Sequence, residues 1–160
     1  MYPNESQPPA DTFNESDAQK YAILALKARA ASAAGLFLLI VGLSVVNTLL
    51  AVLHIPLGMA FGLGLTQILD ALGSHNGFHP LYFVLELIPL GFFALMALLA
   101  RKYWVWLIVG MVFYLIDGAI AVWAQLWIDS LVHGYVLFRL YQGVAAALAA
   151  RNLETMAQPR

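Results

Sequence analysis

The apolar stretch GMVFYLIDGAIAVWAQLW, residues 110–127, carries one charged residue, Asp117, near its middle. A carboxylate in such a place costs about 3 kcal/mol or more unless it is paired. The next apolar stretch, 131–150, also carries one charge, Arg139. If residues 128–130 form a tight turn, both charges lie about 13–15 Å along antiparallel helices from the same face. We therefore predict a buried ion pair between Asp117 and Arg139.

Two more polar side chains, Asn47 and Glu86, fall at a comparable depth in other apolar stretches. With Asp117 and Arg139 they form a predicted intramembrane polar cluster. The residues expected to support this cluster are Gln67, Asp70, Tyr114, Tyr135 and Gln142. Two acids against one arginine leave a carboxyl group that must hold a proton or face water. The cluster could therefore bind a cation or relay a proton, or it could simply lock the helices in register.

Histidine offers an alternative chemistry, a metal site on the outer face. His75 and His79 are spaced i,i+4, but the surrounding sequence SHNGFHP does not favour a helix that presents both rings. The chain has no cysteine and no HExxH motif. We therefore favour no metal and no cofactor, and the candidate ligands that remain are His75, His79 and His133.

No catalytic residue is predicted. The sequence contains no GxSxG motif, no helical Ser–Lys pair and no phosphate-binding loop. Ser44 lies in an apolar stretch that offers no base to activate its hydroxyl group. Serine hydrolysis within the membrane is therefore disfavoured.

The composition determines the class of protein. Hydrophobic residues make up 62% of the chain and charged residues 11%, with a net charge of −1. A soluble domain has about 25% charged residues, so the expected solvent is a lipid bilayer. The chain has no block of basic residues, which excludes a nucleic-acid partner.

The predicted fold is an all-α integral membrane protein with four transmembrane helices and a short re-entrant or interfacial helix on the outer face. Residues 1–16 are expected to be a disordered tail, 17–153 a single membrane domain and 154–160 a short C-terminal tail. The predicted spans are 32–53, 81–100, 104–127 and 131–150, and the re-entrant or interfacial helix covers 58–72.

The positive-inside rule supports this topology. If residues 58–72 do not cross, then Lys20, Lys27, Arg29, Arg101, Lys102, Arg151 and Arg160 all fall on one side of the membrane. If they do cross, Arg101 and Lys102 lie opposite the N-terminal cluster and the bias disappears. We therefore expect both termini in the cytoplasm, with five spans as the alternative.

Four short segments, GLSVVN, GLGLTQILD, YLIDG and LFRLYQG, resemble small multi-span bacterial membrane proteins of uncharacterised function. The resemblance covers most of the chain after the tail. It implies a bacterial inner membrane and no particular activity.

The expected function is that of a small non-enzymatic membrane protein, an accessory or interaction subunit whose Asp–Arg pair locks the bundle. Its partners would be the bilayer and either itself or another membrane protein. One alternative is a homo-oligomeric transporter or channel that uses the polar cluster. Another is a metal-dependent membrane enzyme with its site on the outer face.

Overall fold

The computed structural model describes residues 15–53, 55, 62–75 and 80–157. These residues form five helices: α1 Glu15–Val52, α2 Gly64–His75, α3 Pro80–Lys102, α4 Trp104–Trp123 and α5 Trp127–Ala157. Residues 1–14 of the predicted tail, His54, Gly58, His79 and most of the SHNGFHP segment lie outside the described residues, whereas residues 15 and 16 of that tail already belong to α1.

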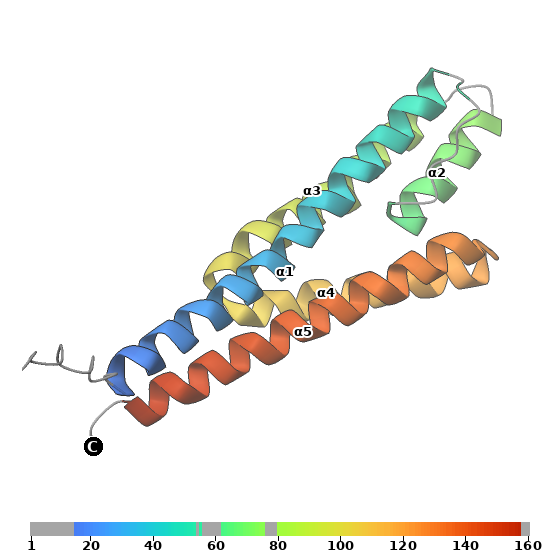
Figure 1. The fold of residues 1–160 in the computed structure, drawn as a ribbon. Helices are drawn as coiled ribbons and strands as arrows, with labels where there is room; N and C mark the ends of the chain where they lie inside the picture. The colour runs from blue at the N-terminus through green and yellow to red at the C-terminus, as the bar shows by residue number, and fades with distance from the viewer. Residues whose placement is uncertain (1–14, 54, 56–61, 76–79, 158–160) are drawn as a thin grey trace, which may run out of the picture.

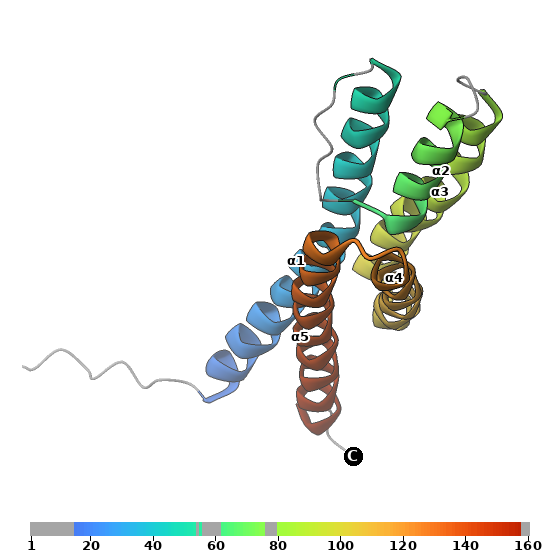
Figure 2. The ribbon, with the colours of Figure 1, turned by 90° about the vertical axis from the view of Figure 1, so that its right-hand side faces the viewer.

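The long helices form two arms that diverge towards one end of the molecule (Figures 1 and 2). The C-terminal part of α1 runs beside α3, and α4 runs beside α5. The short helix α2 lies in the mouth between the arms and contacts α1, α3 and α4. At the opposite end, the start of α1 and the end of α5 come together.

Small and aromatic residues hold the arms together where they meet. A Cβ atom added to Gly143 of α5 would overlap Ala33 of α1, so this pair of small residues lets the two helices pack closely. Beside this contact, the ring of Phe37 lies 5.8 Å from that of Phe93 on α3. The Phe93 ring lies 6.0 Å from Tyr114 on α4 in an edge-to-face arrangement. One aromatic row thus connects α1, α3 and α4.

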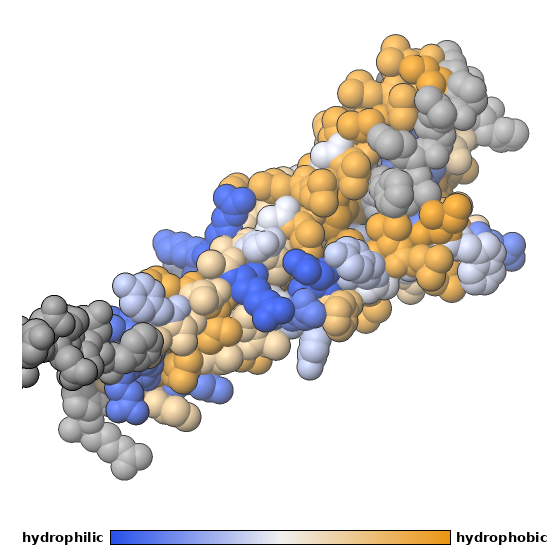
Figure 3. Space-filling model, in the orientation of Figure 1, coloured by the Kyte–Doolittle hydropathy of each residue, from blue (hydrophilic) through white to orange (hydrophobic). Residues whose placement is uncertain are grey.

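Three helices are long and apolar enough to cross a membrane: α1, residues 84–102 of α3, and α4. Helix α2 has 12 residues and is about 18 Å long, too short for a hydrocarbon core of about 30 Å. Large apolar side chains face outwards, among them Ile88 at 68% exposure and Leu115 at 56%. Figure 3 shows such side chains covering the α2 end, while hydrophilic ones gather from the middle towards the other end.

The observed helix boundaries differ from the predicted ones at three places. The predicted first span, 32–53, is the second part of one continuous helix of 38 residues that begins at Glu15. Helix α2 begins at Gly64 and extends to His75 rather than ending at residue 72. Helix α4 ends at Trp123, and α5 has already begun at Trp127, so the predicted turn at 128–130 lies inside α5.

The α4–α5 turn has a clear physical basis. Gln125 adopts φ = 61°, the left-handed conformation that ends many helices. The amide of Leu126 donates to the carbonyl of Ala121 over 3.0 Å, and that of Gln125 donates to Val122 over 3.0 Å. This is a Schellman motif formed with glutamine where glycine is usual.

Candidate functional site

The most connected polar group in the interior is the carboxylate of Asp117, which α4 directs towards the first turn of α2. Its Oδ2 accepts a hydrogen bond from the amide of Gly64 over 2.8 Å, and its Oδ1 accepts one from Leu65 over 2.9 Å. These are the first two amides of α2, which have no partner within their own helix. Asp117, 6% exposed, therefore caps a helix from which it is more than fifty residues distant in sequence.

The third partner of Asp117 is His133 on α5. His133 Nε2 lies 2.9 Å from Asp117 Oδ2, and His133 Nδ1 lies 2.9 Å from the carbonyl oxygen of Asp129. A carbonyl oxygen only accepts, so Nδ1 carries a hydrogen, and one further proton must lie between Nε2 and Asp117. Wherever that proton resides, the Asp117–His133 pair is electrically neutral.

Three neighbours complete the surroundings of this pair. The ring of Tyr114 stacks on that of His133 with centroids 4.4 Å apart and an interplanar angle of 12°. The Asp129 carboxylate is 2% exposed, and its Oδ2 lies 3.6 Å from His133 Nδ1. The side chain of Gln67 on α2 lies beside that carboxylate. The polar groups thus connect α2, α4 and α5.

Glycine allows α2 to come this close. A Cβ on Gly64 would lie 3.2 Å from the carbonyl oxygen of Asp117 and 3.3 Å from the Cβ of Ala121. A Cβ on Gly62 would lie 3.0 Å from the side chains of Ser44 and Asn47. Between the two glycines, the amide of Leu63 donates to Ser44 Oγ over 2.8 Å. The GLGL sequence therefore gives α2 a backbone that can approach both α1 and α4.

A second buried group lies on the other side of α2, against α1 and α3. Thr48 Oγ1 donates to Glu86 Oε2 over 2.8 Å. The carboxyl groups of Asp70 and Glu86 lie within hydrogen-bonding reach of each other, and they are 8% and 1% exposed. Two carboxyl groups can share a hydrogen bond only if one of them is protonated. Burial and mutual repulsion therefore both disfavour two negative charges at this pair.

The predicted Asp117–Arg139 pair does not form. Both carboxylate oxygens of Asp117 are occupied by His133 and the α2 amides, and Arg139 is exposed on the outer side of α5. Arg139 forms no ion pair with any described residue. The physical reason is that a histidine and two amides already neutralise and bind the carboxylate, so no arginine is needed.

The remaining predicted residues divide into two groups. Asn47, Gln67, Asp70, Glu86 and Tyr114 gather with Asp117 around α2. Tyr135, at 62% exposure, and Arg139 face outwards, and Gln142 is half-buried on the same helix. The predicted cluster is therefore only partly assembled, because the exposed Arg139 lies apart from the buried Glu86 and Asp117.

Four residues of the site were not recognised in their roles from the sequence. Ser44 and Thr48 are small hydroxyl residues of an apolar helix and gave no signal. Asp129 fell in the predicted turn at 128–130 and His133 appeared only as a metal candidate, although their i,i+4 spacing places both on one helix face. The depth of His133 relative to Asp117 could have shown the pairing if the turn had been placed correctly.

The geometry at His133 does not resemble that of a hydrolase. Both ring nitrogens are bound to oxygen acceptors, so neither is available to take a proton from a nucleophile. Within the described residues, no three His, Asp or Glu side chains are arranged to hold a metal ion. The side chain of His75 and the whole of His79, the other predicted metal ligands, lie outside what the structure describes. What this arrangement does is fix α2 in the mouth between the arms.

Near the α2 region, an apolar groove of about 430 Å³ lies between α1 and α5. Leu36, Leu39 and Leu43 line it from α1, and Ile128, Val132 and Tyr135 line it from α5. Arg139 follows these three α5 residues at positions i, i+4, i+7 and i+11, which is one continuous helix face. The α5 face that lines the groove therefore continues to Arg139, which forms no ion pair with any described residue.

Comparison of the chain with protein-family models, with curated proteins and with solved structures finds no match.

Proposed function

We propose that this chain is a small, non-enzymatic, multi-pass membrane protein that acts as an accessory or interaction subunit. In this proposal, the groove between α1 and α5 binds a membrane-spanning helix of another protein, and Arg139 pairs with an Asp or Glu of that helix. The single observation that carries the proposal is the position of Arg139, which is exposed, lies on the α5 face that lines an apolar groove, and forms no ion pair with any described residue.

The proposed topology places Arg139 near the middle of the bilayer. Helix α5 would be a fourth span and α2 a re-entrant helix, with both termini in the cytoplasm of a bacterial cell. Arg139 is midway between Trp127 and Arg151, about 18 Å from each along the helix. An arginine at that depth on the lipid-facing surface is unfavourable by about 3 kcal/mol or more, so a partner that offers a carboxylate would stabilise it.

The described residues of a second copy offer no suitable carboxylate. The acids of the apolar part of the chain, Asp70, Glu86, Asp117 and Asp129, are all at most 8% exposed. Of the other described acids, Glu15 and Asp17 lie at the opposite end of α1 from the groove, and Glu154, near the end of α5, pairs with Lys27. A different membrane protein therefore fits the groove better than a homodimer does.

Photocrosslinking in cells tests the proposal. We would place p-benzoylphenylalanine at Tyr135, which lines the groove, and at Phe113, an outward aromatic residue of α4 with 48% exposure, as the matched control. We expect one protein adduct of defined mass at position 135 and none at 113. That adduct should disappear with Arg139→Leu, remain with Arg139→Lys, and return with Arg139→Glu when the partner's acid is changed to lysine.

Three outcomes would overturn the proposal. Equal protein adducts at positions 135 and 113 would mean that α5 has no specific partner. An adduct with the mass of a dimer of this chain would identify a second copy as the occupant. Lipid adducts alone at position 135, unchanged by Arg139→Leu, would mean that the groove faces only the bilayer.

A proton carrier is the second candidate, and the two buried acid-containing pairs beneath α2 favour it. Purified chain in liposomes that contain a pH-sensitive dye would be given a proton gradient. Proton entry that is abolished by Glu86→Gln, with the fold retained, would support a carrier, and no entry above empty liposomes would exclude it.

A further inference from the structure

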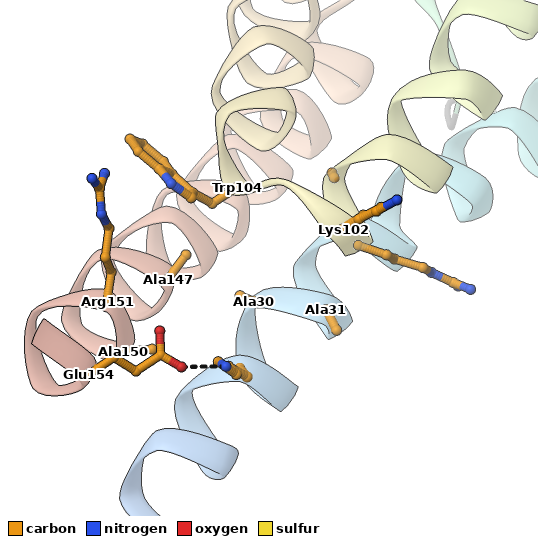
Figure 4. Close-up of a pocket in the computed structure, with 11 residues that line it drawn as sticks. Ala30, Ala31, Lys102, Trp104, Ala147, Ala150, Arg151 and Glu154 are labelled. Atoms are coloured by element: carbon orange, nitrogen blue, oxygen red, sulfur yellow. Dashed lines mark ion pairs between the residues drawn. The ribbon is translucent and has the colours of Figure 1, made fainter. Parts of the chain in front are cut away.

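The end of the molecule opposite α2 contains a second hollow, of about 420 Å³, between the start of α1, the α3–α4 turn and the end of α5 (Figure 4). Its walls are built from alanines. Ala30 and Ala31 line it from α1, and Ala147 and Ala150 line it from α5. The small side chains leave space where larger ones would fill the junction between the helices.

Positive charge surrounds this hollow. Four of the chain's eight Lys and Arg residues line it: Lys27, Arg101, Lys102 and Arg151. Glu154 is the one acid in the lining, so three positive charges are in excess. Three separate helices contribute these cations, which shows that the fold gathers them at one place.

The ion pair in the lining leaves most of the cations available. Lys27 and Glu154 form a salt bridge that joins α1 to α5, as Figure 4 shows. Arg101, Lys102 and Arg151 form no ion pair with any residue that the structure describes. The Arg151 guanidinium carbon lies 5.8 Å from the centre of the Trp104 ring, an aromatic contact that leaves its N–H groups free to bind an anion.

We infer that this hollow binds a phosphate-bearing anion, with the headgroup of an anionic phospholipid as its principal source. Arginine and lysine bind phosphate oxygens through charge-assisted hydrogen bonds. Interfacial pockets lined by basic residues on the cytoplasmic side of a membrane suit anionic headgroups. The alanine walls would contact the glycerol and the first carbons of the acyl chains, which a free phosphate ion lacks.

Native mass spectrometry of the full chain in detergent tests the inference, with phosphatidylglycerol and phosphatidylcholine as probes. We expect one phosphatidylglycerol to be retained per chain and phosphatidylcholine to be lost. Arg151→Gln should lower retention about tenfold, because it removes a charged hydrogen-bond donor from the phosphate. Arg29→Gln is the matched control, since Arg29 is an exposed arginine of α1 that does not line the hollow.

A competition with inorganic phosphate separates the two sources of the anion. If millimolar phosphate leaves the phosphatidylglycerol bound, the lipid headgroup is the ligand; displacement at micromolar phosphate would assign the same site to a soluble phosphate ion. Equal losses in Arg151→Gln and Arg29→Gln, or equal retention of phosphatidylcholine, would overturn the inference. Arg151→Lys keeps the charge and serves if the glutamine variant does not fold: it should retain the lipid more weakly than the parent chain does.

Discussion

Polar side chains gather in two regions of this protein, around the first turn of α2 and at the basic end where α1 begins and α5 ends. Around α2, Asp117 binds two amides and an imidazole, and Glu86 binds a hydroxyl group and a second carboxyl group. At the basic end, Arg101 and Arg151 line a hollow without forming an ion pair to any described residue. We call the first region closed, because its polar groups bind mainly one another, and the second open, because its arginines are left to bind water or another molecule.

The difference shows how this apolar chain uses its few charged residues. A buried polar group is tolerable only if its hydrogen bonds and its charge are satisfied within the fold. The α2 region meets that condition in part: Asp117 and His133 share a proton, while both carboxylate oxygens of Asp129 find no hydrogen-bond donor among the described residues. The basic residues lie at the surface, where water or another molecule can satisfy them, so they can serve binding without supporting the fold.

The largest expected effect comes from opening the closed region at Asp117. Asp117→Ala would leave the Gly64 and Leu65 amides and the His133 ring without their shared acceptor. We expect a loss of about 3–5 kcal/mol in the free energy of unfolding, because breaking a buried polar network leaves its other members unsatisfied. Unfolding in detergent by titration with sodium dodecyl sulfate measures it.

Asp17→Ala is the control for this experiment. Asp17 is exposed and pairs only with Lys20, over 3.1 Å, so its removal should change the free energy of unfolding by less than about 1 kcal/mol. Equal losses at Asp17 and Asp117 would show that the closed region does not stabilise the fold.

A double-mutant cycle sharpens the comparison by asking which residue is the partner of Asp117. We expect a coupling energy of about 1–3 kcal/mol between Asp117→Asn and His133→Gln, because the two side chains share a proton and a hydrogen bond. Between Asp117→Asn and Arg139→Gln the coupling should stay below about 0.5 kcal/mol. The reverse pattern would restore the ion pair that the sequence suggested.

The wrong partner for Asp117 followed from one turn that the sequence does not reveal. Gln125 ends α4 in a left-handed conformation, and neither glycine nor asparagine marks that position. Placing the turn at 128–130 shifted the apparent depth of α5 by about one helical turn, or 5.4 Å. With the turn at Gln125, Asp117 and His133 are equally far from it along the chain, and they meet.

Features with strong local signals could be predicted, and those that depend on the meeting of distant segments could not. Long apolar runs predicted α3 to within two residues at each end, and the predicted span 131–150 lies inside the longer helix α5. The buried state of Glu86 and Asp117 also followed from their apolar neighbours. The binding of the Leu63 amide by Ser44 could not, because nothing in an apolar helix distinguishes a serine that caps another helix.

Substitution of Gly64 tests whether the close approach of α2 is required. Alanine there would place a Cβ 3.2 Å from the Asp117 carbonyl oxygen, a backbone atom that cannot rotate away. We expect the free energy of unfolding of Gly64→Ala to fall by about 1–2 kcal/mol. Gly134→Ala is the matched control: nothing lies within 4 Å of its Cβ position, and alanine in an open helical site should add about 0.5–1 kcal/mol. Thermal unfolding of the two variants measures the change in stability. A decrease for Gly64→Ala with an increase for Gly134→Ala would support the tight packing of α2, and changes of the same sign would contradict it.

The smallest effect is expected for exposed arginines outside the α2 region, and its size decides whether they are free for binding. Arg139→Gln and Arg101→Gln remove exposed cations that have no ion pair within the described chain. The free energy of unfolding of the purified protein should therefore change by less than about 0.5 kcal/mol in each variant. The same denaturant titration measures both, with Asp117→Ala as the reference for a large loss.

A loss above about 1 kcal/mol for Arg139→Gln would mean that this arginine stabilises its own chain. The proposal that the groove beside it binds an acidic partner would then be contradicted. An unchanged stability, together with a lost crosslink at position 135, would separate binding from folding at a single side chain.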